Sequence, residues 1–380
     1  MTAIEQTLNA SPRPLTLDLP YATYEPDAIA DVIDAVKDYP RWFYGNKWRM
    51  LDHILRVIPK GARRIVDLFA GTAVCGNAIK RLTSAAIDSN EISFYGYLRA
   101  ACLVANNNTF LTGRDLRTLT RRNLRRQSWF WDKYRHILGE KNAAWLDNFS
   151  SNIPKLRDPR KRSLAVLIAL LCINSHLKFA AINFTPCGDL TGNQNHRLQN
   201  ADLEADIVAF AQRRLPSLLF DNGQLNEAYR EDAVTMISKF RGQVAYVDSP
   251  YVCRVNYRDL YAWPENLVLC ITGRGDEVRN RFRLNERPSY TRFGRLSSVR
   301  MSFHRLFLNS RQIPVVIVSY NTTSRFAISE IETIARTHGR TVMTQYIPYP
   351  RPTTIKGRNT RTEEVLLVCL SERRLPKEWL

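Results

Sequence analysis

Residues Gly61 to Gly76 read G-A-R-R-I-V-D-L-F-A-G-T-A-V-C-G, and this stretch decides the class of fold that we expect. A short apolar run, Ile65 and Val66, ends at Asp67, and a loop of small residues then leads into a helical pattern. Small residues in such a loop let a bound molecule come close to the backbone. The stretch therefore predicts the first strand, turn and helix of a parallel α/β sheet with a binding site at its edge.

A second apolar run follows about one strand later, in Ser84 to Asn90 (S-A-A-I-D-S-N), and ends at Asp88. An acid at the end of the second strand is placed to bind the ribose of a nucleoside cofactor. A small-residue loop alone is a weak signal. The loop and the acid together favour a nucleoside cofactor over a sheet with no binding role.

The third stretch is Gln243 to Tyr251, Q-V-A-Y-V-D-S-P-Y, in which an apolar run ends abruptly. Asp248 supplies a carboxylate, Ser249 a main-chain carbonyl and Tyr251 an aromatic ring. Two acceptors at the end of a buried strand can bind both hydrogens of an exocyclic amine, and the ring can stack on the base that carries it. An ordinary strand followed by a turn at Pro250 is the alternative for this tetrapeptide alone. Its occurrence beside the other two stretches indicates methylation of an amino group on a nucleobase.

The order of these segments resembles the Dam-like (D12) class of adenine-specific DNA methyltransferases, from about Trp42 to Val368. The aromatic-x-Gly-Gly-Lys segment of that family is matched by Phe43, Tyr44, Gly45, Asn46 and Lys47, and its D-P-F-x-G-x-G loop by Asp67, Leu68, Phe69, Ala70, Gly71, Thr72 and Ala73. Asp88 and Asp232 match two cofactor-binding acids. The catalytic D-P-P-Y is matched by Asp248, Ser249, Pro250 and Tyr251, and a late Ser-Tyr-Asn strand by Val315 to Asn321.

The resemblance implies an α/β fold: a Rossmann-like S-adenosylmethionine-dependent methyltransferase sheet with helices on both faces, and an inserted, mostly helical target-recognition region. The predicted boundaries are an N-terminal arm and helix at 1–37, a catalytic domain in two parts at 38–106 and 225–380, and the insertion at 107–224. The residues implied to bind S-adenosylmethionine are Phe43, Tyr44, Gly45, Lys47, Asp67, Phe69, Ala70, Gly71, Thr72, Asp88 and Asp232. Those implied to act on the base are Asp248, Ser249, Pro250 and Tyr251.

Three residues depart from the family pattern. Asn46 replaces the second Gly of the first segment, Ala73 replaces the last Gly of the loop, and Ser249 replaces the first Pro of the tetrapeptide. Ser249 keeps the main-chain carbonyl and loses only the ring that fixes φ, so we expect the chemistry to be retained. Ala73 adds a Cβ that would crowd a cofactor approaching at that position.

The net charge of +19 over 380 residues points to a polyanionic partner, because each neutralised phosphate releases counterions, and the resemblance implies that this partner is double-stranded DNA. Between Arg114 and Arg135, basic residues are mixed with aromatic ones, a combination suited to phosphates and bases. A solvated helix gives the same pattern and stays an alternative. Asn174 to Arg197, rich in Asn, Gly and Thr, falls where the family reads its target. The predicted DNA contacts are Arg121, Arg122, Arg125, Arg126, Lys178 and Arg197.

Seven cysteines are scattered without a C-x-x-C pair, and no His lies at zinc-site spacing, so no metal is expected. The chain has no apolar stretch long enough to cross a bilayer and no secretory signal, which favours the cytoplasm. The resemblance implies a bacterial or phage protein. A separately encoded restriction endonuclease is an implied partner. Two other functions stay open at this point: methylation of cytosine N4, which presents the same amine, and a non-catalytic nucleic-acid-binding module of the same fold.

Overall fold

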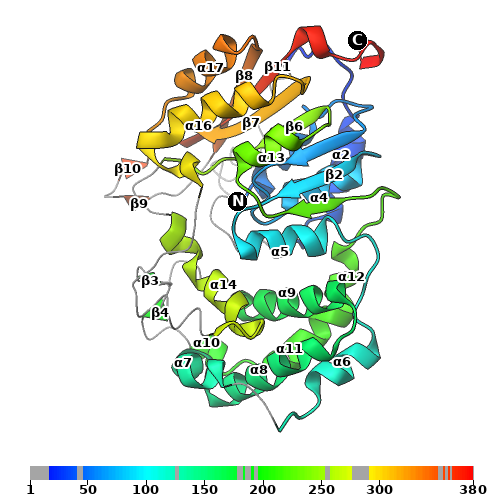
Figure 1. The fold of residues 1–380 in the computed structure, drawn as a ribbon, viewed down its shortest axis with the longest axis vertical. Coiled ribbons are helices and arrows are strands. Elements are labelled where there is room, and N and C mark those ends of the chain that lie inside the picture. The colour runs from blue at the N-terminus through cyan, green and yellow to red at the C-terminus, as the bar shows by residue number, and fades with distance from the viewer. Residues whose placement is uncertain are drawn as a thin grey trace, which may run out of the picture.

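The structure of the protein is a computed structural model that describes residues 17–40, 46–124, 128–177, 183–184, 190–191, 196–252, 257–275, 291–349, 354–355, 358–359 and 362–379. A sheet with its covering helices forms the upper lobe in Figure 1, and a group of helices forms the lower lobe.

The upper lobe contains a seven-stranded sheet in the order β5-β2-β1-β6-β7-β11-β8. Its strands are β1 (Arg64–Asp67), β2 (Ala86–Asn90), β5 (Glu227–Tyr229), β6 (Val244–Val247), β7 (Val315–Asn321), β8 (Thr341–Tyr349) and β11 (Thr362–Leu370). Strands β5, β2, β1, β6 and β7 run parallel to one another, whereas β11 is antiparallel to both β7 and β8. This arrangement confirms the predicted Rossmann-like methyltransferase fold.

Each face of the sheet is covered by its own row of helices. On one face α2 (Pro26–Ala35), α3 (Leu51–Leu55) and α4 (Val74–Leu82) pack in sequence, and α5 (Phe94–Leu103) packs on β2 and β5. On the other face lie α13 (Ala233–Lys239), α16 (Leu296–Asn309) and α17 (Ile328–Thr337). Successive side chains of a strand point to opposite faces, so Ile65 joins the first core and Val66 the second.

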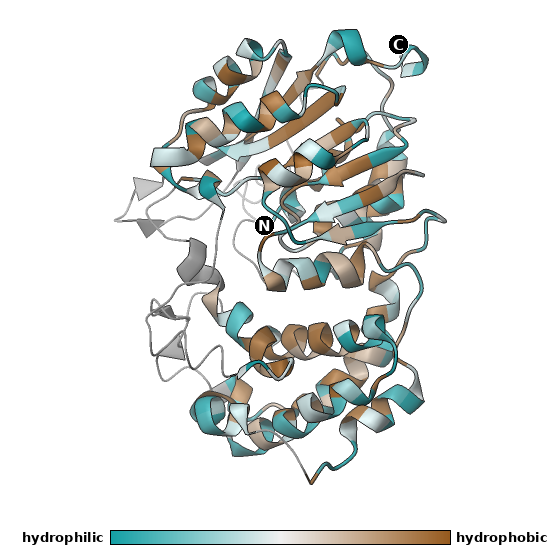
Figure 2. Cartoon of the chain, in the orientation of Figure 1, coloured by the Kyte–Doolittle hydropathy of each residue, from teal (hydrophilic) through white to brown (hydrophobic). Residues whose placement is uncertain are grey.

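The lower lobe is helical, as the sequence predicts for the insertion. It comprises α6 (Gly113–Thr120), α7 (Trp129–Leu138), α8 (Glu140–Asn152), α9 (Pro159–Ser175), α10 (His196–Gln199), α11 (Leu203–Ala209), a π-helical turn (Phe210–Arg214) and α12 (Leu215–Leu218). Helix α9 is buried throughout residues 164–174 and forms the apolar centre of this lobe, coloured brown in Figure 2. Helix α14 (Tyr257–Ile271), which comes after the catalytic strand in the sequence, packs against α8 and α9. The helical lobe therefore draws on two chain segments, which the predicted boundaries did not anticipate.

The remaining elements are short. They are η1 (Trp48–Met50), η2 (Ile153–Lys155), η5 (Arg292–Gly294), η6 (Glu372–Arg374), η7 (Lys377–Trp379) and the strand pairs β3 (Asn183–Phe184) with β4 (Leu190–Thr191) and β9 (Thr354–Ile355) with β10 (Arg358–Asn359). In the part of the chain that the structure describes, no helix has the length and apolar character needed to cross a membrane.

Candidate active site

The carboxyl ends of β1, β2 and β6 lie side by side, and the small-residue loop leaves β1 there. The loop enters α4 through Ala73, which is fully buried and has a φ of 61°. No other non-Gly residue with positive φ occurs in the described ranges. A Gly adopts this left-handed conformation without strain, so the family's Gly at this position has a backbone reason. The side chain of Ala73 belongs to the apolar core.

Asp67 ends β1 and is almost completely buried. Its Oδ2 accepts a hydrogen bond of 3.1 Å from the backbone N–H of Gly76, whereas its Oδ1 is buried and has no hydrogen-bond partner in the described structure. A Cβ at Gly76 would lie 3.2 Å from Oδ2 of Asp67 and 3.0 Å from Oγ of Ser89. Burial first, and then the charge of Asp248, raise the pKa of Asp67 to about 8. The loop thus surrounds a carboxyl group that forms no ion pair within the described residues.

The acid of the second strand differs from the sequence prediction in its surroundings. Asp88 lies two residues before the end of β2 and forms a two-bond ion pair with Arg64, 2.9 Å for each bond. Glu91 follows β2 directly and is mostly buried. Its Oε2 accepts from the N–H of Gly71 in the loop at 3.0 Å, and its Oε1 accepts from the N–H of Ser93. Glu91 therefore occupies the strand-end position that the sequence assigned to Asp88.

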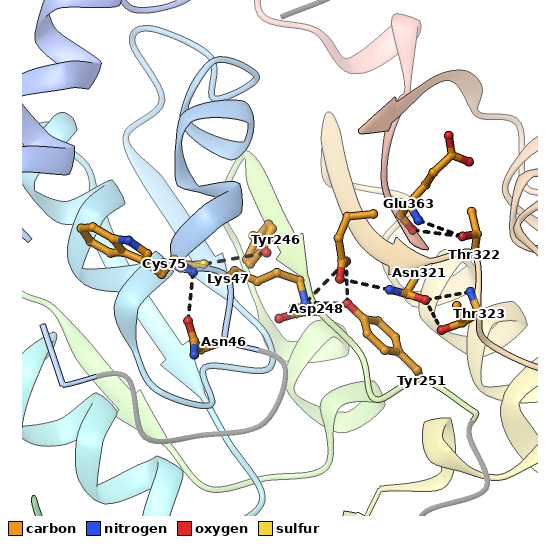
Figure 3. Close-up of polar contacts among 12 residues, drawn as sticks. Asn46, Lys47, Cys75, Tyr246, Asp248, Tyr251, Asn321, Thr322, Thr323 and Glu363 are labelled. Carbon is orange, nitrogen blue, oxygen red and sulfur yellow. Dashed lines mark hydrogen bonds and ion pairs between the residues drawn. The ribbon is translucent and has the colours of Figure 1, made fainter. Parts of the chain in front are cut away.

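The tetrapeptide lies at the end of β6, where Lys47 joins it from the N-terminal segment (Figure 3). The ammonium of Lys47 lies 2.8 Å from Oδ1 of Asp248 and donates to the hydroxyl of Tyr251 at 2.5 Å. That hydroxyl donates in turn to Oε2 of Glu364 at 2.9 Å, and Asn321 donates to Oε1 at 3.1 Å. A buried cation is thus held between two acidic side chains and a tyrosine.

Asp248 is held in an environment that opposes its charge. Burial raises the pKa of Asp248 to about 6, although the ammonium of Lys47 acts in the opposite direction. A carboxylate with this pKa is ionised at neutral pH and becomes protonated just below it. Asp248 can therefore serve as a hydrogen-bond acceptor in the physiological range.

Ser249 is 1% exposed, and its Oγ has no hydrogen-bond partner within the described part of the chain. Pro250 follows it and is partly exposed, and the ring of Tyr251 packs edge-on against Tyr320 with centroids 5.2 Å apart. The departure at Ser249 thus adds a buried hydroxyl that contributes no bond to the surrounding protein.

A cavity of about 410 Å³ opens beside the site, between α13 and the start of α16. Asp232 lines it and caps α13 by accepting from the N–H of Val234 at 2.9 Å. Phe293 lines it too and contacts Phe69 of the loop edge-on, with centroids 5.2 Å apart. Asp232 and Phe69, far apart in the sequence, are thereby brought to the same side of the sheet.

The predicted DNA contacts are spread over the helical lobe. Arg121 and Arg122 are exposed in the turn after α6, which Figure 1 shows at the lower end of the molecule, far from β6. The carbonyl of Arg121 accepts from the side chains of Asn148 and Asn152, so the turn is tied to α8. Arg197 is exposed on α10. Phe43, Tyr44, Gly45, Arg125, Arg126 and Lys178 lie outside the described residues.

Sequence reasoning missed three buried charged residues at or beside the site: Glu91, Arg99 and Glu364. Arg99 is fully buried and donates to the carbonyl of Thr72 at 2.9 Å and to that of Pro40 at 2.5 Å. It thereby ties the loop after β1 to the chain that leads to Lys47. The signal for Glu91 was its place directly after the stretch Ser84 to Asn90, three residues beyond Asp88. Among the described residues no cluster of three or more His, Cys, Asp or Glu side chains has the arrangement of a metal site.

The amino-acid sequence is similar to those of known methyltransferases. Type II methyltransferase M2.HphI of Haemophilus parahaemolyticus is 23% identical over 350 residues, which cover 87% of this chain and 97% of that protein. Type II methyltransferase M.FokI of Planomicrobium okeanokoites is 22% identical over 336 residues, covering 78% and 47% of the two chains. Modification methylase StsI of Streptococcus sanguinis is 25% identical over 252 residues, covering 60% and 36%. The aligned regions thus make up less than half of the last two relatives.

A family profile decides between the functions that the sequence left open. The profile described as D12 class N6 adenine-specific DNA methyltransferase matches residues 43–321, which is more than half of the chain and includes both the loop after β1 and the tetrapeptide. The match confirms the predicted family and favours adenine N6 over cytosine N4 and over a module without activity. The chain belongs to the D12 class of N6 adenine-specific DNA methyltransferases.

Proposed function

We propose that this enzyme transfers a methyl group from S-adenosylmethionine to N6 of an adenine flipped out of duplex DNA, and that Asp248, Ser249 and Tyr251 carry the reaction. The observation that carries the proposal is the arrangement at the end of β6. There an acid with a pKa of about 6 and an aromatic ring share one buried lysine. An adenine inside a duplex cannot reach such a site, so the base must leave the stack.

The residues present fit S-adenosylmethionine. Asp67 offers a buried carboxyl oxygen without a partner in the described structure, which suits a cationic cofactor. Glu91, rather than Asp88, is our candidate for the ribose hydroxyls, because Asp88 is committed to Arg64. Asp232 lines the cavity of about 410 Å³ and Phe69 packs on Phe293 of its lining, so these two residues are our candidates for the adenine end. When bound, the cofactor supplies an electrophilic methyl group.

In the proposed mechanism, the chain acts by orientation and electrostatics. Tyr251 stacks on the flipped adenine, while the Asp248 carboxylate and the Ser249 carbonyl accept the two N6 hydrogens. These bonds direct the nitrogen lone pair toward the methyl group and stabilise positive charge as it develops on the amine. Asp248, with its raised pKa, is the candidate acceptor for the proton that N6 must lose.

The test of this function is the nucleoside content of DNA exposed to the enzyme. Plasmid recovered from cells that lack an adenine methylase of their own and express the wild-type chain should contain N6-methyl-2′-deoxyadenosine by mass spectrometry, and plasmid from such cells expressing Asp248→Ala should not. N4-methyl-2′-deoxycytidine in place of N6-methyl-2′-deoxyadenosine would overturn the substrate assignment. Sequencing of the methylated sites would give the recognition sequence.

We also propose a cytoplasmic enzyme that acts with a separately encoded restriction endonuclease, since relatives named type II methyltransferases support that context. Plasmid DNA modified by the enzyme should then resist one endonuclease of matching specificity.

The hydroxyl of Ser249 is expected to be dispensable. Because Oγ has no partner in the described structure, both Ser249→Ala and Ser249→Pro should keep single-turnover methylation within about threefold of wild type. Proline keeps the carbonyl that accepts the N6 hydrogen and restricts φ. If both variants lose rate while folding and cofactor affinity are unchanged, the hydroxyl has a role of its own and the carbonyl-only account fails.

Binding of S-adenosylmethionine is expected to release a proton through Asp67. Its pKa of about 8 means that the free enzyme carries a protonated carboxyl at pH 7, and a nearby cationic cofactor lowers that pKa. Isothermal titration calorimetry at pH 7 in phosphate and in Tris should give different binding enthalpies, and the difference should disappear in Asp67→Asn. Equal enthalpies in both buffers for the wild type would contradict the prediction.

The arginines of the turn after α6 can be tested by salt dependence. If Arg121 and Arg122 bind phosphates, reversing both charges should weaken binding to all DNA sequences and flatten the slope of log K against log salt by about 0.9 for each lost contact. Arg373 and Arg374 are a matched control, because they form an adjacent, exposed pair on η6 at the other end of the molecule. Equal slopes for the two double variants would mean that the turn is a solvated surface without contacts to DNA phosphates.

A further inference from the structure

Glu364 is a buried acid of the active site that lies beyond the residues matched by the family profile. We propose that Glu364 is a positioning residue, which holds the hydroxyl of Tyr251 and thereby fixes the ring on which the target adenine stacks. The proposal rests on the proposed function, because it requires Tyr251 to meet a flipped base.

The topology explains how Glu364 reaches the site. Strand β11 is antiparallel to β7, so the beginning of β11 lies at the same edge of the sheet as the ends of the parallel strands. Glu364 stands directly opposite Asn321, the last residue of β7. Its side chain is 3% exposed. A carboxylate buried to this degree is costly unless hydrogen-bond donors surround it.

Both carboxylate oxygens of Glu364 have a donor. Asn321 donates to Oε1 at 3.1 Å, and the hydroxyl of Tyr251 donates to Oε2 at 2.9 Å. The Asn321 amide is held in turn, because its own Oδ1 accepts from the N–H of Thr323 at 2.7 Å. Glu364 is thus anchored on one side by β7 and engages Tyr251 with its other oxygen.

The direction of the bonds at Tyr251 is set by Lys47. Because the ammonium of Lys47 can only donate, the hydroxyl accepts from it and must donate its own hydrogen to Glu364. Nζ of Lys47 is 2.5 Å from the hydroxyl oxygen but 4.9 Å from the ring centroid, so the ammonium lies beyond the hydroxyl rather than over the ring. The hydroxyl is therefore held by two bonds at the end of a ring that is 8% exposed.

Tyr320 supplies the remaining support, since its ring contacts that of Tyr251 at 80° between planes. Edge-on packing limits tilt of the ring, whereas the bond to Glu364 limits movement along the sheet edge. A ring held by these contacts can receive a base without first being ordered, which lowers the entropic cost of reaching a reactive geometry.

A double-mutant cycle tests the proposal. Tyr251→Phe keeps the ring and removes only the hydroxyl, and Glu364→Gln removes the charged acceptor. Single-turnover methylation should fall about tenfold in each single variant and no further in the double variant, because both substitutions act on the same bond: Phe removes it, and Gln weakens it by replacing the charged acceptor with a neutral amide oxygen. With 2-aminopurine at the target position, fluorescence on binding should rise above the wild-type level in all three variants, because the flipped base is stacked less firmly.

Glu363→Gln is the matched control. Glu363 precedes Glu364 on the same strand, and its side chain points away from Asp248 and Tyr251 in Figure 3. This variant should keep both the wild-type rate and the wild-type fluorescence. Thermal melting and S-adenosylmethionine affinity should be measured for every variant, so that loss of folding is recognised. If Glu364→Gln does not fold, the single variant Tyr251→Phe decides.

The outcomes separate cleanly. A rate that falls about a hundredfold in the double variant would mean that Glu364 acts independently of the hydroxyl, for example on Lys47, and would overturn the proposal. Full activity and unchanged fluorescence in Tyr251→Phe would overturn it as well. A wild type that places no methyl group on adenine N6 would instead overturn the proposed function itself, before any variant is compared.

Discussion

Asp248→Ala should lower the single-turnover rate of methylation by roughly a hundred- to a thousandfold while S-adenosylmethionine still binds. The substitution removes an acceptor that matters most as charge develops on N6, so its cost falls on the transition state rather than on the bound cofactor. The measurement is methylation of a DNA carrying the identified site, beside calorimetric titration of the cofactor. Equal rates in wild type and variant would remove Asp248 from the mechanism.

The pH profile gives an independent check on the same residue. Because burial raises the pKa of Asp248 to about 6, the wild-type kcat/KM should fall as the pH is lowered through about 6, where the acceptor becomes protonated. Asp248→Asn keeps a carbonyl oxygen but cannot ionise, so its residual activity should lack this acid limb. An acid limb that survives in Asp248→Asn would belong to another group.

The parallel part of the fold and the catalytic strand could be predicted from the sequence because they obey a local rule. In β1 and β6 an apolar run ends at an acid, Asp67 and Asp248, and parallel strands bring such ends to one edge. At β2 the same rule selected Asp88, which lies three residues before the acid that follows the strand, Glu91, because β2 continues past Asp88. The pairing of Asp88 with Arg64 depends on the register between β1 and β2, which the sequence does not reveal.

The roles of Glu364 and Arg99 could not be predicted from the local sequence around them. Glu364 stands near the beginning of a strand, and it reaches the site only because β11 runs against its neighbours. Arg99 lies in the middle of α5, where a charged residue ordinarily indicates a solvent-facing position, yet it is fully buried against carbonyl groups of two distant segments. Both residues carry out tertiary roles, and only the folded arrangement identifies them.

The second large effect concerns Lys47, the buried cation that pairs with Asp248 and Glu364. Lys47→Met should lower the free energy of unfolding at pH 8 by about 3–5 kcal/mol, because it leaves the buried Glu364 and the partly exposed Asp248 without their ammonium partner. Lys60→Met is a suitable control, since Lys60 is exposed and should change stability by less than about 0.5 kcal/mol. Urea unfolding of the two variants and the wild type gives the comparison.

The pH dependence of that loss follows from the pKa of Asp248. Lys47 holds this pKa down, so its removal raises the folded-state value above the present one of about 6. Between the two values the variant binds a proton that the wild type does not, and the binding stabilises its folded state. The loss of unfolding free energy in Lys47→Met, relative to the wild type, should therefore become smaller as the pH is lowered from 8 toward 6. Below pH 6 this deficit should stay constant. Lys47→Arg, which keeps the charge, should show a smaller deficit with little dependence on pH. A deficit for Lys47→Met that is the same at pH 6 and pH 8 would show that the lysine stabilises the site by packing rather than by its charge.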